Sequence, residues 1–265
     1  MGRMFSSWKA DCNRFIFNSR FWLSVFCIVA ICFLSSSYYI WEGTGGITTV
    51  SNILYMTIVF SNSIILLVLF ASFPAASSFC SDWNCQYIRC HVSRSGIKGY
   101  IGGRILSCIT SSFLACFLGI LLFVLILLTF FPLANAERDV SLNAIPTLHK
   151  LYLISPWLYL IYHIFIISLA TATWSVVGLC ISAWIPNRFI ALLSPFICYY
   201  ILDTFSLQLP MLINFYHINK GTDILNMGNP WLNLLYIIAI YTVLMALFGC
   251  LFGRTVKRRV GNEIT

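Results

Sequence analysis

The feature that most constrains this chain is the scarcity of charge along it. Charged residues make up 9% of the 265 residues, whereas 60% are hydrophobic. An ordinary soluble domain is about one quarter charged, so this chain cannot cover a globular surface with ionic groups. Its hydrophobicity also excludes disorder, which requires a low apolar content. A polytopic membrane protein remains, and the length allows about six spanning helices of roughly 20 residues each.

Six apolar runs match that expectation and predict an all-α transmembrane domain over residues 21–254. The predicted spans are 21–41, 51–73, 101–131, 155–182, 189–204 and 231–253. Charges precede the first run, but the run is too long for the core of a signal peptide and no small-x-small cleavage site follows it. We therefore predict that it is retained as the first spanning helix.

Lysine and arginine residues are distributed very unevenly between these runs. If the N-terminus lies inside, 13 of the 16 cations fall on inner segments and only Arg138, Lys150 and Lys220 fall outside. Cytoplasmic loops of membrane proteins carry such an excess of positive charge. The sequence thus predicts both termini in the cytoplasm, with 255–265 as a basic tail. The expected location is a bacterial cell membrane, and the lack of an Asn-x-Ser/Thr acceptor in the chain is consistent with a bacterial source.

The segment before the first span, residues 1–20, has a helical pattern of its own. On a helical wheel its apolar face is formed by Phe5, Trp8, Cys12, Phe15 and Ile16. Asp11, Arg14 and Asn18 lie away from that face. This pattern predicts an amphipathic helix lying in the inner membrane interface. The alternative is a basic tail that only helps to set the topology.

The inner loop at 79–100 is the longest on the cytoplasmic side. In it Tyr87, Ile88 and Val92 can share one side of a short helix. The flanking charges come from Arg89, Arg94 and Lys98. An apolar knob ringed by cations suits docking into a groove of a cytoplasmic partner. The alternative is a basic loop whose long side chains snorkel and only fix the topology.

The outer segment 205–218 is apolar but too short to span a membrane, and Pro210 interrupts it. A stretch of this length is typical of re-entrant or interfacial segments. Asp203, just before it, has two open interpretations, the lining of an exit path or an anchor at the outer interface. The lone His163 in the fourth span is expected to form a core hydrogen bond.

Polar and small residues also follow single faces inside the spans. Asn52, Tyr55 and Asn62 share a face of the second span, which predicts either a polar lining or a seam between subunits. In the fourth span Ser168, Thr171 and Ser175 favour helix packing, as do Gly249 and Gly253 in the sixth.

Motifs for catalysis, nucleotide binding and metal binding are missing from the sequence. It contains no Gly-x-x-x-x-Gly-Lys-Ser/Thr, no His-Glu-x-x-His and no Cys-x-x-Cys. Cys80, Cys85 and Cys90 are spaced by five residues, which is not a zinc spacing. We therefore predict no catalytic residue, metal site or cofactor in this chain, and no nucleic-acid partner. The cysteines avoid the predicted outer loops, so reduced thiols are expected.

The order of these elements resembles the membrane-spanning permease subunit of type-2 ABC exporters. The most specific part is the run from Tyr87 to Tyr100, which is similar to the same region of Gram-positive bacteriocin and lantibiotic immunity transporters. There a Tyr-Ile-Arg sequence is followed by Ser-Arg and a basic stretch that enters the third span. In this chain Gly102-Gly103 stands where a bulkier pair is common.

The resemblance implies that this chain works together with other protein subunits. A second permease, identical or homologous, would pair with this chain through spans one and five. Two ATPase subunits would bind ATP and Mg²⁺ and dock on a coupling helix at 82–96, with Arg188 as a second inner contact. Spans two and five would line the path, and 205–218 would cap its exit. The apolar spans favour an amphipathic cargo, such as an antimicrobial peptide or a lipid-like molecule.

Three other classes of protein remain as alternatives. A membrane scaffold, or the sensor partner of a kinase, could dock its partner through 79–100 equally well. A membrane-embedded enzyme would need a cluster of inward catalytic residues, and none is found in the sequence. A secondary carrier would show an inverted repeat with two interrupted helices, whereas only one interrupted segment is present.

Overall fold

The computed structural model describes residues 2–43, 49–59, 63–134, 146–221, 224 and 229–264, and all regular elements in this part of the chain are helices. The helices are α1 (Gly2–Ile16), α2 (Ser19–Gly43), α3 (Val50–Val59), α4 (Ile64–Ser72), α5 (Ser78–Asn84), α6 (Tyr87–Ser95), α7 (Ile97–Leu127), α9 (Pro146–Ile154), α10 (Pro156–Trp184), α11 (Arg188–Ser206), α12 (Phe215–Lys220) and α13 (Pro230–Ile264). The predicted all-α architecture is confirmed.

Five of these helices are long and apolar enough to cross a membrane. They are α2, α7, α10, α11 and α13, and they correspond to the first, third, fourth, fifth and sixth predicted spans. The chain is therefore a multi-pass membrane protein by the length and composition of its helices.

The described residues of the second predicted span, 51–73, form two short helices. These are α3 and α4, which have 10 and 9 residues and are each too short to cross a membrane alone. The Ser63 hydroxyl, just before α4, donates a hydrogen bond of 2.8 Å to the carbonyl oxygen of Thr57 on α3. A side chain that bonds to the backbone in this way competes with helical hydrogen bonding.

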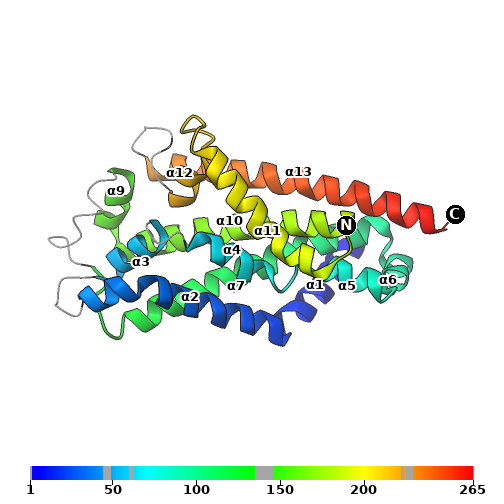
Figure 1. Ribbon diagram of the computed structural model, residues 1–265, viewed down its shortest axis with the longest axis horizontal. Helices are drawn as coiled ribbons and strands as arrows, with labels where there is room; N and C mark the ends of the chain where they lie inside the picture. The colour runs from blue at the N-terminus through cyan, green and yellow to red at the C-terminus, as the bar shows by residue number, and fades with distance from the viewer. Residues whose placement is uncertain are drawn as a thin grey trace.

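Helix α10 forms the centre of the molecule, and the long helices α7, α11 and α13 pack around it. In the most apolar 18-residue stretch of α10, 89% is buried inside the protein. The corresponding share is 22–44% in the other four long helices. Helices α4, α7, α11 and α13 all pack directly against it. The long helices run along the length of the molecule, and α11 crosses the others obliquely (Figure 1).

Small residues let the helices approach closely around this centre. Ser112 on α7 donates a hydrogen bond of 2.6 Å to the Ser175 hydroxyl on α10, as expected of a packing face. A Cβ atom added to Gly178 on α10 would lie 2.5 Å from the Pro195 ring of α11 and 3.1 Å from the Ala191 carbonyl oxygen. Helices α10 and α11 therefore touch nearly backbone to backbone at this point.

Apart from α3 and α4, the short helices lie toward the two ends of the molecule (Figure 1). Helices α1, α5 and α6 and the end of α13 lie at one end, which we call the α6 end, and α9 and α12 lie at the other, the α12 end (Figure 1). The segments assigned to the same membrane side by the positive-charge pattern therefore lie together in space.

Candidate functional site

The most unusual feature at the α6 end is a buried group of charged side chains. It consists of Asp11 and Arg14 from α1, Asp82 from α5 and Arg104 from α7, and we call it the ionic cluster. The side chains of Arg104, Asp82 and Asp11 are 0%, 1% and 4% exposed, whereas that of Arg14 is 48% exposed. Three separate segments of the chain thus each contribute a charged side chain that is shielded from water, namely Asp11, Asp82 and Arg104.

Ion pairs join the members of this cluster in a fixed order. The Arg14 guanidinium lies 3.2 Å from the Asp82 carboxylate, which is also ion-paired with Arg104. On its other side Arg104 lies 3.4 Å from a carboxylate oxygen of Asp11. Because a buried charge is tolerated only when it is paired, each of these side chains depends on the others.

Aromatic rings enclose the cluster. The Tyr100 hydroxyl donates a hydrogen bond of 3.2 Å to Asp82. The Arg104 guanidinium carbon lies 5.4 Å from the centre of the Phe15 ring and 5.5 Å from that of Tyr100. Arg14 lies 5.5 Å from the centre of the Tyr87 ring on α6, so the cluster reaches from the core to the exposed surface.

The orientation of α1 differs from the one that its helical wheel predicts. Asp11, which was expected to point away from the apolar face, is buried against α7, and Phe5 is 62% exposed. Phe15 is buried as expected, and Trp8 and Ile16 are half-buried. The physical reason is Arg104, whose charge draws the Asp11 side of the helix inward.

A glycine explains how α1 can lie so close to α7. A Cβ atom on Gly103 would meet the Ser7 hydroxyl at 2.6 Å and the Trp8 backbone nitrogen at 3.2 Å. The neighbouring Gly102 instead lines a groove between α7 and α13. Gly102 and Gly103 therefore serve two different helix faces.

Cys12 also lies in the contact between α1 and α7. Its sulfur is 3.1 Å from the Thr110 hydroxyl. Burial raises the pKa of the Cys12 thiol above its usual value, and the hydrogen bond to Thr110 partly opposes this shift. The thiolate, which is the reactive form, is therefore scarce while α1 remains docked.

Helix α6 carries most of the residues predicted to contact a partner. It begins after Gln86, which has φ 55°, and it ends at Gly96, with φ 73°. Tyr87 is 47% exposed, Lys98 just after the helix is exposed, and Val92 is half-buried. The side chains of Arg89 and Arg94 lie outside the described residues.

Ile88 corrects the prediction of an apolar knob on α6. This side chain is only 3% exposed and belongs to a buried cluster with Phe79, Tyr100 and Phe252. It fixes α6 to the protein and is unavailable to a partner. The wheel placed Tyr87 and Ile88 on one side of the helix, but it could not tell which of the two the core would bury.

The predicted second inner contact, Arg188, is exposed at the first residue of α11. The side chain of Asn187 caps this helix by accepting a hydrogen bond of 2.9 Å from the Phe189 backbone nitrogen. Nearby, Arg259 donates a hydrogen bond of 2.6 Å to the Trp184 carbonyl oxygen and lies over the Trp83 ring at 5.3 Å. The end of α13 is thereby tied to α5 and α10.

The polar residues predicted for the second span do not form one continuous described stripe. Asn52 is half-buried and Tyr55 is 7% exposed, both on α3. Asn62 lies outside the described residues. Tyr55 belongs to the main apolar core, so the described part of this face packs inside the protein.

Asp203 takes part in a polar network at the α12 end. It accepts a hydrogen bond of 3.4 Å from Tyr199, which in turn accepts one of 3.0 Å from Asn219 on α12. The Tyr241 hydroxyl of α13 donates to the same Asn219 side chain. The network joins α11, α12 and α13, so the segment after 205 is attached to the long helices through buried amides and phenols.

The interrupted outer segment itself is exposed and apolar before it reaches α12. Leu207, Leu209, Leu212 and Ile213 are 46–58% exposed, whereas Phe215 and Ile218 on α12 are buried. Pro210 lies within the exposed part, between Leu209 and Leu212. The segment therefore has one face for the protein and one for its surroundings.

His163 lies fully buried in α10 between the rings of Tyr159 and Tyr162. Neither ring nitrogen has a hydrogen-bond partner among the described residues. The described residues thus pack aromatic rings against His163, and the predicted core hydrogen bond is not found among them.

Comparison of the chain with protein-family models, with curated proteins and with solved structures gives no match. Any function proposed for this chain rests on its own residues and on their arrangement.

Proposed function

We propose that the chain is the membrane-spanning permease of an ATP-driven exporter of the type-2 ABC class. Two ATPase subunits would dock at the α6 end, and a second permease, identical or homologous, would complete the pore. The cargo would be an amphipathic molecule, such as an antimicrobial peptide or a lipid-like compound. The membrane would be the bacterial cell membrane, with both termini in the cytoplasm.

The observation that carries this proposal is the series of contacts that leads inward from Tyr87. The exposed Tyr87 ring lies against Arg14, Arg14 is paired with Asp82, and Asp82 is paired with the buried Arg104 of α7. A partner that pushes on α6 would therefore displace α1, α5 and α7 together. Coupling of this kind needs a contiguous network of packed and paired groups.

The surface of α11 supports a second subunit. Phe189, Leu193, Ile197 and Phe205 are 48–77% exposed along this helix. A shallow apolar cavity of about 320 Å³ lies beside them and is lined by Ile181, Ser194 and Cys198 as well. Such a face suits either lipid or a second permease, and the proposal assigns it to the permease.

The test is to extract the tagged chain gently from its native host and to count the proteins that co-purify by mass spectrometry. We expect a P-loop ATPase in near-equimolar amount. Replacing Tyr87 with alanine should weaken its binding by roughly 2 kcal/mol, as for a central aromatic contact, so that the ATPase is lost on washing. Phe130→Ala, which removes an aromatic side chain that is 76% exposed near the opposite end of α7, should retain it.

Two results would contradict the exporter. In the first, the chain purifies without any ATPase. In the second, a histidine kinase co-purifies with the chain and no ATPase does. The second result would favour a scaffold or sensor partner that uses the same α6 surface.

The proposed orientation has a separate test that uses native thiols. Cys85 and Cys90 are exposed at the α6 end. A membrane-impermeant maleimide should leave both unmodified in intact cells and label both in inside-out vesicles. Phe130→Cys should show the reverse pattern, since it lies near the other end. Labelling of Cys85 and Cys90 in intact cells would place the α6 end outside.

A further inference from the structure

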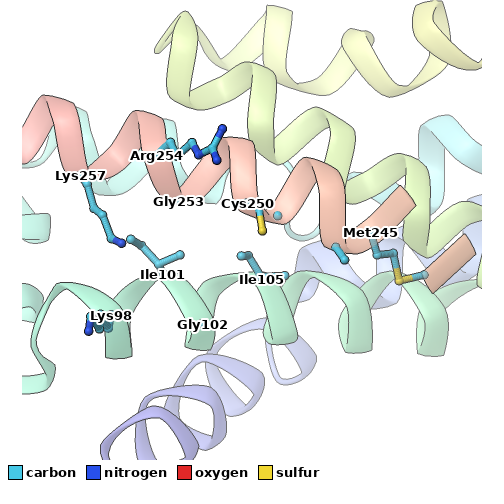
Figure 2. A pocket seen from close by; sticks show the side chains of 11 residues that line it. Lys98, Ile101, Gly102, Ile105, Met245, Cys250, Gly253, Arg254 and Lys257 are labelled. Atoms are coloured by element: carbon cyan, nitrogen blue, oxygen red, sulfur yellow. The ribbon is translucent and has the colours of Figure 1, made fainter. Parts of the chain in front are cut away.

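A groove between α7 and α13 has no part in the proposed coupling of ATPase and permease. Its volume is about 500 Å³. Ile101 and Ile105 of α7 point toward α13, and Cys250 and Lys257 of α13 point back toward α7 (Figure 2). Both helices are candidate membrane spans, so the groove opens along a surface that lipid would cover.

Glycines shape the wall that α13 gives to this groove. A Cβ atom on Gly249 would lie 3.3 Å from Ile105, and one on Gly253 would lie 3.3 Å from Ile101. The two helices are thus in direct contact through small residues, and the groove beside the contact is floored by Gly102 of α7. The result is an open groove whose lining near the glycines is apolar.

The groove changes from apolar to cationic along its length. Ile105 and Met245 line the part nearer the middle of the helices, and Lys98, Arg254 and Lys257 line the part at the α6 end. All three cations are exposed, and none is ion-paired with a described residue. None of the described residues that line the groove is acidic.

We infer that this groove binds one anionic phospholipid of the inner leaflet. An acyl chain would lie along Ile101, Ile105 and the glycines, and the phosphate would lie among Lys98, Arg254 and Lys257. Basic pockets between membrane helices on the cytoplasmic side bind anionic headgroups in this manner. The inference goes beyond the proposed function, and it depends only on the α6 end facing the cytoplasm.

A helix from a second copy of the chain fits the groove less well. The three cations, which have no ion-pair partner among the described residues, would need acidic partners on a second copy, and the chain has only eight acidic residues. Two of these, Asp11 and Asp82, are already buried beside Arg104. Charge complementarity therefore favours a lipid phosphate over another copy.

The experiment uses the full chain in phosphatidylcholine vesicles with a trace of phosphatidylglycerol that carries a photoactivatable acyl chain. We expect cross-links in 98–105 and 245–257, at about ten times or more the yield of the matching phosphatidylcholine probe, because each cation near the surface adds severalfold to the preference. The triple variant Lys98→Gln, Arg254→Gln, Lys257→Gln should bring the ratio of the two yields close to one. Gly102→Leu should reduce cross-linking of both lipids by filling the groove.

A matched control removes the same amount of charge elsewhere at this end. The triple variant Lys9→Gln, Arg20→Gln, Arg188→Gln should keep the preference for phosphatidylglycerol, because these side chains do not line the groove. Equal yields from the two lipids in the unaltered chain, or an equal loss in the control, would overturn the inference. It would also be overturned by Cys250–Cys250 cross-links between two copies that abolish lipid labelling, since these would show that a second copy fills the groove.

Discussion

Replacing Arg104 with methionine should lower the free energy of unfolding by about 3–5 kcal/mol, the usual effect of removing one partner from a buried ion pair. Arg104 is fully buried and paired with both Asp11 and Asp82. Methionine keeps much of the side-chain volume but leaves two buried carboxylates with only the half-exposed Arg14 to compensate them. The measurement is denaturant unfolding of the purified chain in detergent, followed by circular dichroism.

A second substitution distinguishes lost charge from lost packing. Adding Asp82→Asn to Arg104→Met should recover part of the lost free energy, because the cluster then has one fewer uncompensated acid. Arg20→Met serves as the control, since Arg20 is exposed and a surface change of this kind alters stability by only about 0.5 kcal/mol. If Arg104→Met and Arg20→Met unfolded alike, the cluster would contribute nothing to stability.

The second large effect is expected from Gly103→Leu, which should separate α1 from α7. A side chain at this position would meet Ser7 and the Trp8 backbone, and backbone atoms cannot give way as a flexible side chain can. Overpacking of this kind costs about 1–3 kcal/mol. Because 1.4 kcal/mol corresponds to a factor of ten, Cys12 should be alkylated roughly tenfold faster or more once α1 is displaced.

The alkylation rate of Cys12 is read peptide by peptide with mass spectrometry. In the unaltered chain the reaction should be slow, because the thiol packs against Thr110 and burial raises its pKa. Gly102→Leu is the matched control, since the neighbouring glycine faces the groove instead of α1. Unchanged Cys12 reactivity in Gly103→Leu would mean that α1 does not depend on this close contact.

Most of the architecture could be predicted from the apolar runs, because the length and composition of a spanning helix are local properties. Five long helices correspond to five predicted spans, and the described residues of the second run form the shorter helices α3 and α4. Just before α4, Ser63 bonds to the Thr57 carbonyl, a competition between side chain and backbone that hydropathy does not measure.

The ionic cluster could not be predicted, because its members are distant in the sequence. A helical wheel treats Asp11 as a residue for water, and nothing near it in the chain indicates an arginine partner. Arg104 was counted only as an inner cation that sets topology, although an arginine within an apolar helix is itself a sign of a buried partner. The same limitation applies to Ile88 and Tyr87, whose roles are decided by which side of α6 the core covers.

Pairing between α1 and α7 also has a consequence for the order in which the protein is assembled. The ribosome makes Asp11 long before Arg104, with which it pairs. Until α7 has entered the membrane, α1 lacks its main packing surface, and its acid must stay in contact with water. Although α1 precedes α7 in the chain, it can therefore reach its final place only after α7 has been inserted.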